Sequence, residues 1–269
     1  NLDKPRGKTS FEVVAAVRRL SGERRVGHGG TLDPEATGVL AICLGQGTRL
    51  VEFLAEAKKT YRAEIELGIS TDTYDATGKV TGRGDTSALT REEVEAAAAS
   101  FSGLVEQIPP MYSAVKHQGV PLYRWARAGV ELPRTARKVE FSRIKILEWQ
   151  TPLLTLEVEC SKGAYIRSLA HDLGEKLGCG AHLRNLVRLS SGPFHISDAV
   201  TMSRIEDAFR EGWWSAGLRL KQPAPFLFSD LDPKTYSSRG RTTLYWNPSP
   251  ANNRPGWLPC AMPPTTPRR

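Results

Sequence analysis

The chain has 269 residues, of which 40% are hydrophobic and 25% charged, as in a soluble globular protein with one large domain or one domain plus an appendage. No apolar run approaches the roughly 20 residues of a membrane-spanning helix, and no signal-peptide pattern is present, so we expect a cytoplasmic protein without membrane contact. The net charge of +8 suggests a polyanionic partner, but residues 221–269 alone carry +5. A nucleic-acid surface within residues 1–220 must therefore come from local clusters of basic side chains.

The four cysteines show no spacing typical of a disulfide framework or of a metal site. Cys43 and Cys160 lie in apolar runs, where a small buried hydrophobic residue is the simplest interpretation. Cys179 and His182 supply at most half of a zinc site. We therefore expect no metal ion.

The N-terminal residues predict an amphipathic helix rather than a nucleotide-binding loop. Gly7 is followed by Lys and Thr as in a P-loop, but that motif requires a glycine where Leu2 stands. Thr9 or Ser10 suits a helix N-cap. The apolar stripe of the predicted helix consists of Phe11, Val14, Val17 and Leu20.

Residues 26–40 combine four glycines with one imidazole, His28, and one carboxylate, Asp33. A proline follows Asp33 and keeps it extended or in a turn. The apolar run 39–44 predicts a buried strand, so the carboxylate is presented on a tight loop against a rigid scaffold, where chemistry is often located. The residues alone favour a plainer alternative, an Asx-turn in which Asp33 bonds only to its own backbone.

A helix over residues 47–57 and an alternating strand over residues 58–68 are predicted next. The helix is expected to turn Leu50, Phe53 and Leu54 inward. The following loop, 70–78, holds Asp72 and Asp75, but it lacks the further oxygen ligands that calcium requires. A solvated turn is the expected structure.

A capping box at Thr90 opens an Ala-rich helix that ends near Ser100. Residues 103–115 contain too many prolines for a central strand. Residues 116–127 then interleave basic and aromatic side chains, which suits a surface that holds phosphates and stacks on bases. An amphipathic helix that begins at Pro121 is an equally good interpretation, and the two are compatible.

Two long strands are predicted over residues 136–149 and 153–161, followed by a helix over residues 161–177. Arg167 lies in the first turn of that helix, where a cation opposes the helix dipole and benefits from an anionic partner.

The predicted elements end with short strands over residues 183–189 and 193–196 and a capped helix over residues 203–212. Residues 221–269 hold ten of the 18 prolines and almost no apolar periodicity, which is typical of a linker or a disordered tail.

Residues 27–40 closely resemble the catalytic motif of the TruB family of tRNA pseudouridine synthases. Other segments are similar to further motifs of that family and follow in the same order: residues 2–10, 59–62, 71–78, 109–116 and 160–169. The resemblance covers roughly residues 2–200 and is highly specific because several independent motifs agree.

The resemblance implies an α+β fold, in which a mixed α/β catalytic domain (residues 1–220) is built around a long, mainly antiparallel sheet. An insertion near residues 105–135 is expected to contact RNA. The implied activity is isomerisation of uridine 55 in the T-loop of tRNA to pseudouridine, without metal or cofactor. The expected partner is the T-loop and T-stem of tRNA, and we expect a monomer with no obligate protein partner.

Carried over by position, the resemblance implies that Asp33 is the nucleophile, that Arg167 pairs with it and that Tyr61 stacks on the target base. His28 matches a histidine associated with flipping the nucleotide, and Leu186 matches an apolar residue that lines the base pocket. These roles agree with elementary chemistry, because a nucleophilic carboxylate must be ionised and a base inside a folded loop must be flipped out to react.

Two departures from the family are visible. The small RNA-binding domain of the PUA type that usually ends its members has no recognisable counterpart in residues 221–269, and the strand expected ahead of Asn1 is cut short. Two other functions stay open: a tRNA-folding chaperone in which Asp33 has no role, and the catalytic subunit of a guide-RNA particle.

Overall fold

The computed structural model describes residues 1–211. The predicted domain boundary at residue 220 and the proline-rich segment 221–269 lie outside the described residues. Within residues 1–211, none of the helices is long and apolar enough to cross a membrane.

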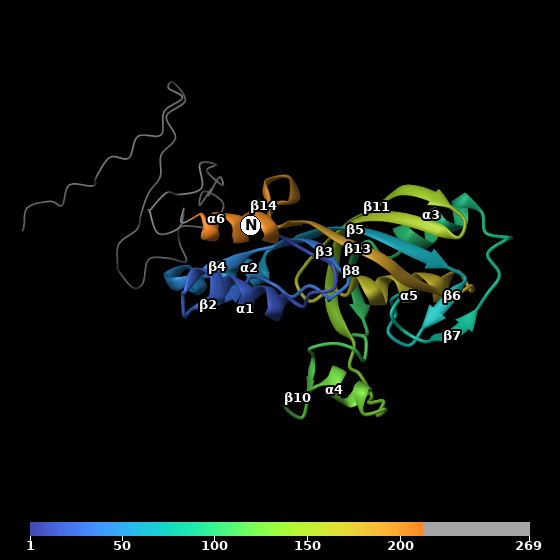
Figure 1. The fold of residues 1–269 in the computed structure, drawn as a ribbon. Helices are drawn as coiled ribbons and strands as arrows, with labels where there is room; N and C mark the ends of the chain where they lie inside the picture. The colour runs from blue at the N-terminus through green and yellow to red at the C-terminus, as the bar shows by residue number, and fades with distance from the viewer. Residues whose placement is uncertain (212–269) are drawn as a thin grey trace, which may run out of the picture. The chain divides into compact units, whose positions relative to one another are not determined.

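A large mixed sheet organises the described residues (Figure 1). In chain order its strands are β1 (Leu2–Lys4), β3 (Thr37–Leu40), β5 (Lys59–Leu67), β8 (Gly103–Gln107), β11 (Arg137–Gln150), β12 (Leu153–Cys160), β13 (Ala181–Ser191), β14 (Phe194–His195) and β15 (Val200–Thr201). Their order across the sheet is β15-β1-β3-β13-β5-β12-β11-β8, and β14 pairs with β13. The pairs β1–β15 and β3–β13 are parallel and the others antiparallel, which confirms the predicted mainly antiparallel α+β fold.

The long central strands follow the alternation of their side chains. In β5, Ala63, Ile65 and Leu67 are buried, and the residues between them are more exposed. Every second residue points to the same face of a strand, so this pattern supplies one apolar face. The predicted strands 58–68, 136–149 and 153–161 are confirmed as β5, β11 and β12 to within one or two residues. The proline-broken segment after residue 103 contributes only the edge strand β8.

Six α-helices accompany the sheet within residues 1–211. They are α1 (Ser10–Ser21), α2 (Val51–Glu56), α3 (Arg91–Ala99), α4 (Leu122–Arg127), α5 (Ile166–Lys176) and α6 (Met202–Arg210). The N-cap predicted at Thr9 or Ser10 is Thr9, which opens α1 with a capping box, and the capping box predicted at Thr90 is formed at the N-terminus of α3. The short 3₁₀ helices are η1 (Gly45–Leu50) and η2 (Ile196–Asp198). Three small two-stranded sheets pair β2 (Val26–His28) with β4 (Ile42–Leu44), β6 (Ile69–Thr71) with β7 (Val80–Arg83), and β9 (Lys116–His117) with β10 (Val120–Pro121).

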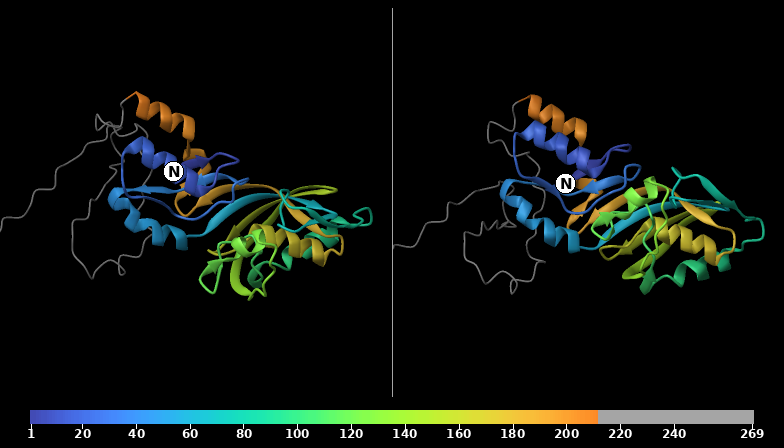
Figure 2. Two further views of the ribbon diagram at one scale, coloured as in Figure 1. Left: turned by 60° about the horizontal axis from the view of Figure 1, so that its bottom comes forward. Right: turned by 90° about the horizontal axis from the view of Figure 1, so that it is seen from below.

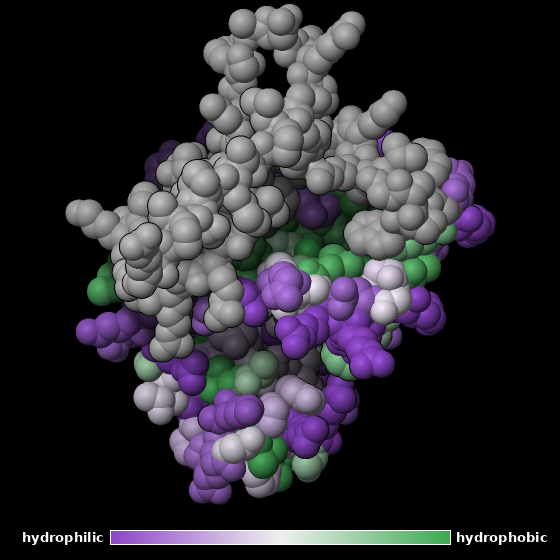
Figure 3. Space-filling view, turned by 90° about the vertical axis from the view of Figure 1, so that its left-hand side faces the viewer, coloured by the Kyte–Doolittle hydropathy of each residue, from purple (hydrophilic) through white to green (hydrophobic). Residues whose placement is uncertain are grey.

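Two buried clusters hold these elements together. The larger one joins α3 and α5 to strands β5, β11, β12 and β13, and it includes Phe141 and Leu173. The smaller one packs α1 against β1, β2 and β3, with α6 along its edge. Figure 2 shows α6 beside α1, away from α5. The coloured part of the face in Figure 3 mixes hydrophilic and hydrophobic side chains. Scattered exposed apolar residues are ordinary on protein surfaces.

Three local predictions are wrong in detail. Phe11 is 71% exposed, because the buried face of α1 consists of Ser10, Val13, Val14 and Val17, about 100° away around the helix. Phe53 is also exposed, since the predicted helix 47–57 begins as the 3₁₀ turn η1 and becomes α-helical only from Val51. The apolar run 39–44 divides at Ala41 into β3 and β4, which join different sheets.

The C-terminal elements also differ from the prediction. The expected strand 183–189 is part of β13, which spans 11 residues and contains two register shifts. The expected strand 193–196 is reduced to β14, and η2 follows it. The last helix is capped by Thr201, two residues earlier than expected.

Candidate active site

Asp33 lies on the loop between β2 and β3, and contacts with the first strand and turn fix that loop. Lys4 is fully buried, and its Nζ donates to the carbonyls of Pro34 (2.9 Å), Pro5 (2.8 Å) and Lys8 (2.6 Å). Burial lowers the pKa of Lys4 to about 8. The backbone on the C-terminal side of Asp33 is therefore held by a buried cation.

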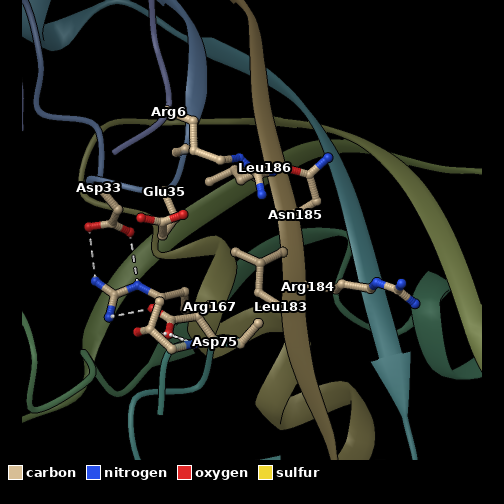
Figure 4. A pocket seen from close by; sticks show the side chains of 12 residues that line it. Arg6, Asp33, Glu35, Asp75, Arg167, Leu183, Arg184, Asn185 and Leu186 are labelled. Atoms are coloured by element: carbon tan, nitrogen blue, oxygen red, sulfur yellow. Dashed lines mark hydrogen bonds and ion pairs between the residues drawn. The ribbon is translucent and has the colours of Figure 1, made fainter. Parts of the chain in front are cut away.

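Arg167 grips the carboxylate of Asp33 with two hydrogen bonds. Its Nε donates to Oδ2 at 2.9 Å and its Nη2 to Oδ1 at 3.1 Å (Figure 4). The side chain of Arg167 is 5% exposed, whereas that of Asp33 is 39% exposed. A bidentate pair with one buried partner fixes both the position and the rotation of the carboxylate. Asp33 is thus held by Arg167 on the protein side and accessible from the solvent side.

Three further oxygens surround the guanidinium of Arg167. Nη2 donates to the carbonyl of Tyr112 at 2.9 Å, and Nη1 donates to the carbonyl of Thr73 at 3.3 Å. Nη1 also lies 3.8 Å from Oδ2 of Asp75. A buried charge is tolerated only when it is paired and hydrogen-bonded, and both conditions are met here.

Asp75 therefore corrects the prediction that residues 70–78 form a merely solvated turn. Its Oδ1 accepts from the N–H and hydroxyl of Thr77 and from the hydroxyl of Thr73, which leaves Oδ2 directed at Arg167. Asp72 does fit the prediction, because it is exposed and accepts from the N–H of Lys79. Composition alone does not separate the two carboxylates, because their difference lies in the tertiary contact.

A cavity of about 180 Å³ opens beside the ion pair. Its lining includes Asp33, Arg167 and Leu186, three of the five predicted site residues. Figure 4 shows Leu183 and Leu186 on β13 facing the ion pair across the cavity, and Arg184 pointing away from Asp33. The remaining lining residues are Arg6, Glu35, Ala36, Asp75, Ala76, Thr77 and Asn185. The site thus offers an ionic wall and an apolar wall, as a flat, partly polar ring requires.

The other two predicted site residues, Tyr61 and His28, lie outside this lining. Tyr61, on β5, is 8% exposed and belongs to the same buried cluster as Ala36 and Leu186. Burial raises the pKa of Tyr61, and the nearby charge of Arg188 opposes that shift. His28, at the end of β2, accepts a hydrogen bond from the N–H of Gly30 at Nδ1 (3.3 Å). Burial, followed by the charge of Arg188, lowers the pKa of His28, so the ring is neutral near pH 7.

Arg188 is a structural residue that the sequence argument missed. It is 1% exposed, and it donates from Nε to the carbonyl of Val39 (2.6 Å) and from Nη2 to the carbonyl of Gly30 (3.1 Å). These bonds tie β13 to both ends of the loop that carries Asp33. One signal was available: Arg188 is two residues after Leu186, so it lies on the same inward face of the strand.

The insertion after β8 contacts the site through Tyr112, and the rest of it carries basic side chains. Tyr112 supplies the carbonyl that binds Arg167, while the β9–β10 hairpin and α4 extend away from the sheet (Figures 1 and 2). On α4 the guanidinium of Arg127 lies 5.5 Å from the ring centroid of Tyr123. The helix predicted to begin at Pro121 is confirmed, with Pro121 as its N-cap.

Cys43, Cys160 and Cys179 are buried free thiols, as expected for Cys43 and Cys160. His182 directs Nδ1 at the carbonyl of Ile69 (3.0 Å), not at a thiol. Among residues 1–211, no three His, Cys, Asp or Glu side chains converge in a way that could hold a metal ion.

Comparison with known proteins identifies the family. Residues 18–166 match the model of the TruB family pseudouridylate synthase N-terminal domain, and residues 167–219 match that of the tRNA pseudouridylate synthase B C-terminal domain. The tRNA pseudouridine synthase B of Dehalococcoides mccartyi (strain ATCC BAA-2266 / KCTC 15142 / 195) is 50% identical over 212 residues, which cover 79% of this chain and 71% of the relative. The protein of the same name from Geobacter sulfurreducens is 47% identical over 211 residues, covering 78% and 69%.

Solved structures agree with this assignment. A chain in the crystal structure of a Cbf5–Nop10–Gar1 complex is 33% identical, with a TM-score of 0.64 over 81% of this chain and 56% of that one. A chain in an H/ACA RNP bound to a substrate RNA containing 2′-deoxyuridine is 30% identical, with a TM-score of 0.60 over 81% and 55%. This chain spans little more than half the length of those two. The fold, the family models and the curated relatives agree, and the chain belongs to the TruB family of tRNA pseudouridine synthases, isomerases that convert uridine in RNA to pseudouridine.

Proposed function

We propose that this protein isomerises uridine 55 in the T-loop of tRNA, with Asp33 as the nucleophile. The observation that carries the proposal is the pairing of a half-exposed carboxylate with a buried, bidentate Arg167 at the wall of a cavity. A nucleophile must be ionised and aimed, and this arrangement does both. The resemblance of residues 27–40 to the family's catalytic motif supports the assignment of position 55.

The isomerisation needs no external reactant. The bond between N1 of uracil and C1′ of the sugar breaks, the base turns, and a bond forms between C5 and C1′. The proton on C5 leaves and N1 takes up a proton, so atoms and electrons balance. Asp33 would carry the intermediate as a covalent adduct, on the base or on the sugar, and Arg167 would keep the carboxylate in reacting position throughout.

The remaining site residues would receive the flipped nucleotide. Leu186 would cover one side of the base from β13, where it already lines the cavity. Tyr61 would stack on the base, which recovers about 1–3 kcal/mol of the cost of flipping. Because Tyr61 is 8% exposed, its ring would become accessible only after a local movement of its neighbours. His28 would accommodate the nucleotide as a neutral ring.

The insertion would bind the T-stem and T-loop through its basic and aromatic side chains. We propose a cytoplasmic monomer that works without a protein partner or cofactor. The catalytic subunit of a guide-RNA particle is the less favoured alternative, because the proteins named tRNA pseudouridine synthase B cited above are 47–50% identical, whereas the chains from the Cbf5–Nop10–Gar1 complex and the H/ACA RNP are 33% and 30% identical. The third possibility is a tRNA-folding chaperone that needs no nucleophile.

Incubation with unmodified tRNA transcript, followed by mapping of pseudouridine, tests the proposal. A matched transcript with cytidine at position 55 serves as the control and should give no product. Asp33→Asn should abolish the product while tRNA affinity stays the same. Pseudouridine at another position would overturn the site assignment, and an unchanged yield with Asp33→Asn would overturn the nucleophile. If Asp33→Asn retains tRNA refolding and the wild type makes no pseudouridine, the chaperone is the correct function.

A further inference from the structure

Two stacked rings, those of Tyr74 and His171, lie beside the ion pair and have no role in the mechanism above. Their centroids are 3.9 Å apart and their planes differ by 5°. Tyr74 belongs to the loop between β6 and β7, and His171 lies on α5 four residues after Arg167. Residues four apart lie on the same helix face. Arg167 and His171 therefore meet the same loop one helical turn apart.

Tyr74 stands between the two loop residues that contact Arg167. The carbonyl of Thr73 accepts from Nη1 at 3.3 Å, and Oδ2 of Asp75 lies 3.8 Å from the same atom. The backbone of the loop is bonded to β13, because the N–H of Leu183 donates to the carbonyl of Tyr74 at 3.0 Å. The ring stack adds a separate contact with α5, the helix that carries Arg167.

Tyr74 has an unusual backbone conformation, and His171 buries a polar atom, so both residues require support from their surroundings. Tyr74 has a φ of +63°, a left-handed conformation that is rare for a bulky residue and persists only where neighbours hold it. Nδ1 of His171 is buried and has no hydrogen-bond partner among the described residues. Burial also lowers the pKa of His171, so a neutral ring faces Tyr74. The contact between these rings is made through their faces, as their nearly parallel planes show.

We propose that Tyr74 and His171 form a positioning pair for the isomerisation. Their stack holds residues 73–75 against α5, so that Thr73 and Asp75 keep the guanidinium of Arg167 in the rotation that aims Asp33. The inference rests on the proposed roles of Asp33 and Arg167. Neither ring lines the cavity, so the pair acts through Arg167 and not on the substrate.

Single-turnover and steady-state kinetics on tRNA test this pair. Tyr74→Ala and His171→Ala should each lower kcat roughly 2- to 10-fold, the loss expected from one stacked pair, with KM unchanged. Tyr74→Phe and His171→Phe keep a ring and should retain the wild-type kcat. Lys79→Ala, an exposed truncation in the same loop, is the matched control and should leave kcat unchanged. The double Ala variant should lose no more than the worse single variant, because the two residues act as a unit.

Amide hydrogen exchange supplies a readout that does not depend on turnover. Truncation of either ring should speed exchange at the N–H groups of Ala76 and Leu183, which bond the loop to β13. If Tyr74→Ala does not fold, Tyr74→Leu fills the space without a ring face. Wild-type kcat in His171→Ala, with Asp33→Asn inactive, would overturn the pair and leave the proposed function standing. If the wild type makes no pseudouridine, the function fails, and unchanged exchange in the truncations would refute the pair by itself.

Discussion

The ammonium of Lys4 donates to the carbonyl of Pro34 at 2.9 Å, one residue beyond Asp33. The backbone N–H of Gly7 donates to the same carbonyl at 2.9 Å. A residue 30 positions earlier in the chain thus sets the path of the backbone that leaves the candidate nucleophile. The charge of Lys4 has a structural role, because its ammonium is fully buried among carbonyl oxygens.

Lys4→Met should destabilise the protein by roughly 2–4 kcal/mol, because the carbonyls of Pro5 and Lys8 lose the buried ammonium as a donor and that of Pro34 keeps only the N–H of Gly7. Turnover should fall as well, since the loop of Asp33 loses an anchor. Urea unfolding and single-turnover kinetics measure the two effects. Lys8→Met, the same exchange at an exposed lysine, is the control. Equal stability of the two variants would show that the contacts of Lys4 make no net contribution to the free energy of unfolding.

Arg167→Lys should reduce kcat about 100-fold or more although the positive charge is kept. An ammonium cannot reproduce the fork that grips both oxygens of Asp33 and two carbonyls, and a misplacement of about 1 Å costs this much. The affinity for tRNA should not change. Arg143→Lys makes the same exchange in an exposed ion pair with Glu157 and should be silent. A loss below tenfold would mean that charge alone is sufficient.

Gly38→Ala should destabilise the fold by roughly 3 kcal/mol or more. Gly38 has a φ of +99°, and an added Cβ would lie 2.3 Å from the backbone carbonyl oxygen of Arg188, where no flexible side chain can yield. Gly47→Ala is the control, because its Cβ would meet no atom within 4 Å. Thermal and urea unfolding of the two variants give the comparison, and similar midpoints would refute the close packing of β3 on β13.

Tyr61→Leu should lower kcat about 5- to 150-fold, the equivalent of the stacking energy on one base, while the Kd for tRNA stays the same. Leucine fills part of the core but offers no ring face. Phe141→Leu, in the same buried cluster, reports the cost of the packing defect alone. Tyr61→Phe should retain most of the turnover. If tRNA affinity falls with the rate and saturated turnover holds, the stacking role is wrong.

Asp172→Asn should stabilise the protein near neutral pH and have little effect in acid. Burial raises the pKa of Asp172 from 3.8 to about 6, with a contribution from Glu175. The folded state therefore binds more protons than the unfolded state between about pH 4 and 6, and the stability that Asp172 supplies when protonated is lost as the pH rises through 6. The gain from Asn should reach about 1–2 kcal/mol at pH 7.5 and shrink at pH 5. A gain independent of pH would contradict this origin.

The sequence predicted those elements in which apolar residues repeat with the period of the strand or helix and so form one buried face. Strands β5, β11 and β12 and the capped helices α1 and α3 follow from local pattern alone. The misassigned positions are those where tertiary contact decides: the 3₁₀ turn η1 at the start of the predicted helix 47–57, the exposed Phe11, and the division of residues 39–44 between two sheets. Periodicity does not record which neighbour a strand will find.

The same division applies to the site. Asp33 and Arg167 were named from motifs, and the structure brings them together with Leu186 at one cavity. The contributions of Thr73 and Tyr112 were not predictable, because each is a backbone carbonyl, which every residue supplies whatever its side chain. Arg188 was missed because a charged residue in a strand is usually exposed, and its partners are carbonyls far away in the chain.

The environment of Arg167 also has a consequence for the time at which the site is completed. Its hydrogen-bond partners precede it by 134 residues (Asp33), 94 residues (Thr73) and 55 residues (Tyr112). During synthesis the carboxylate therefore leaves the ribosome well before the arginine that aims it. Contacts so distant in sequence form slowly, because loops must close first. A nascent chain that has reached residue 160 carries the proposed nucleophile but not the arginine that orients it, so catalytic competence should arrive late in folding, with the docking of α5.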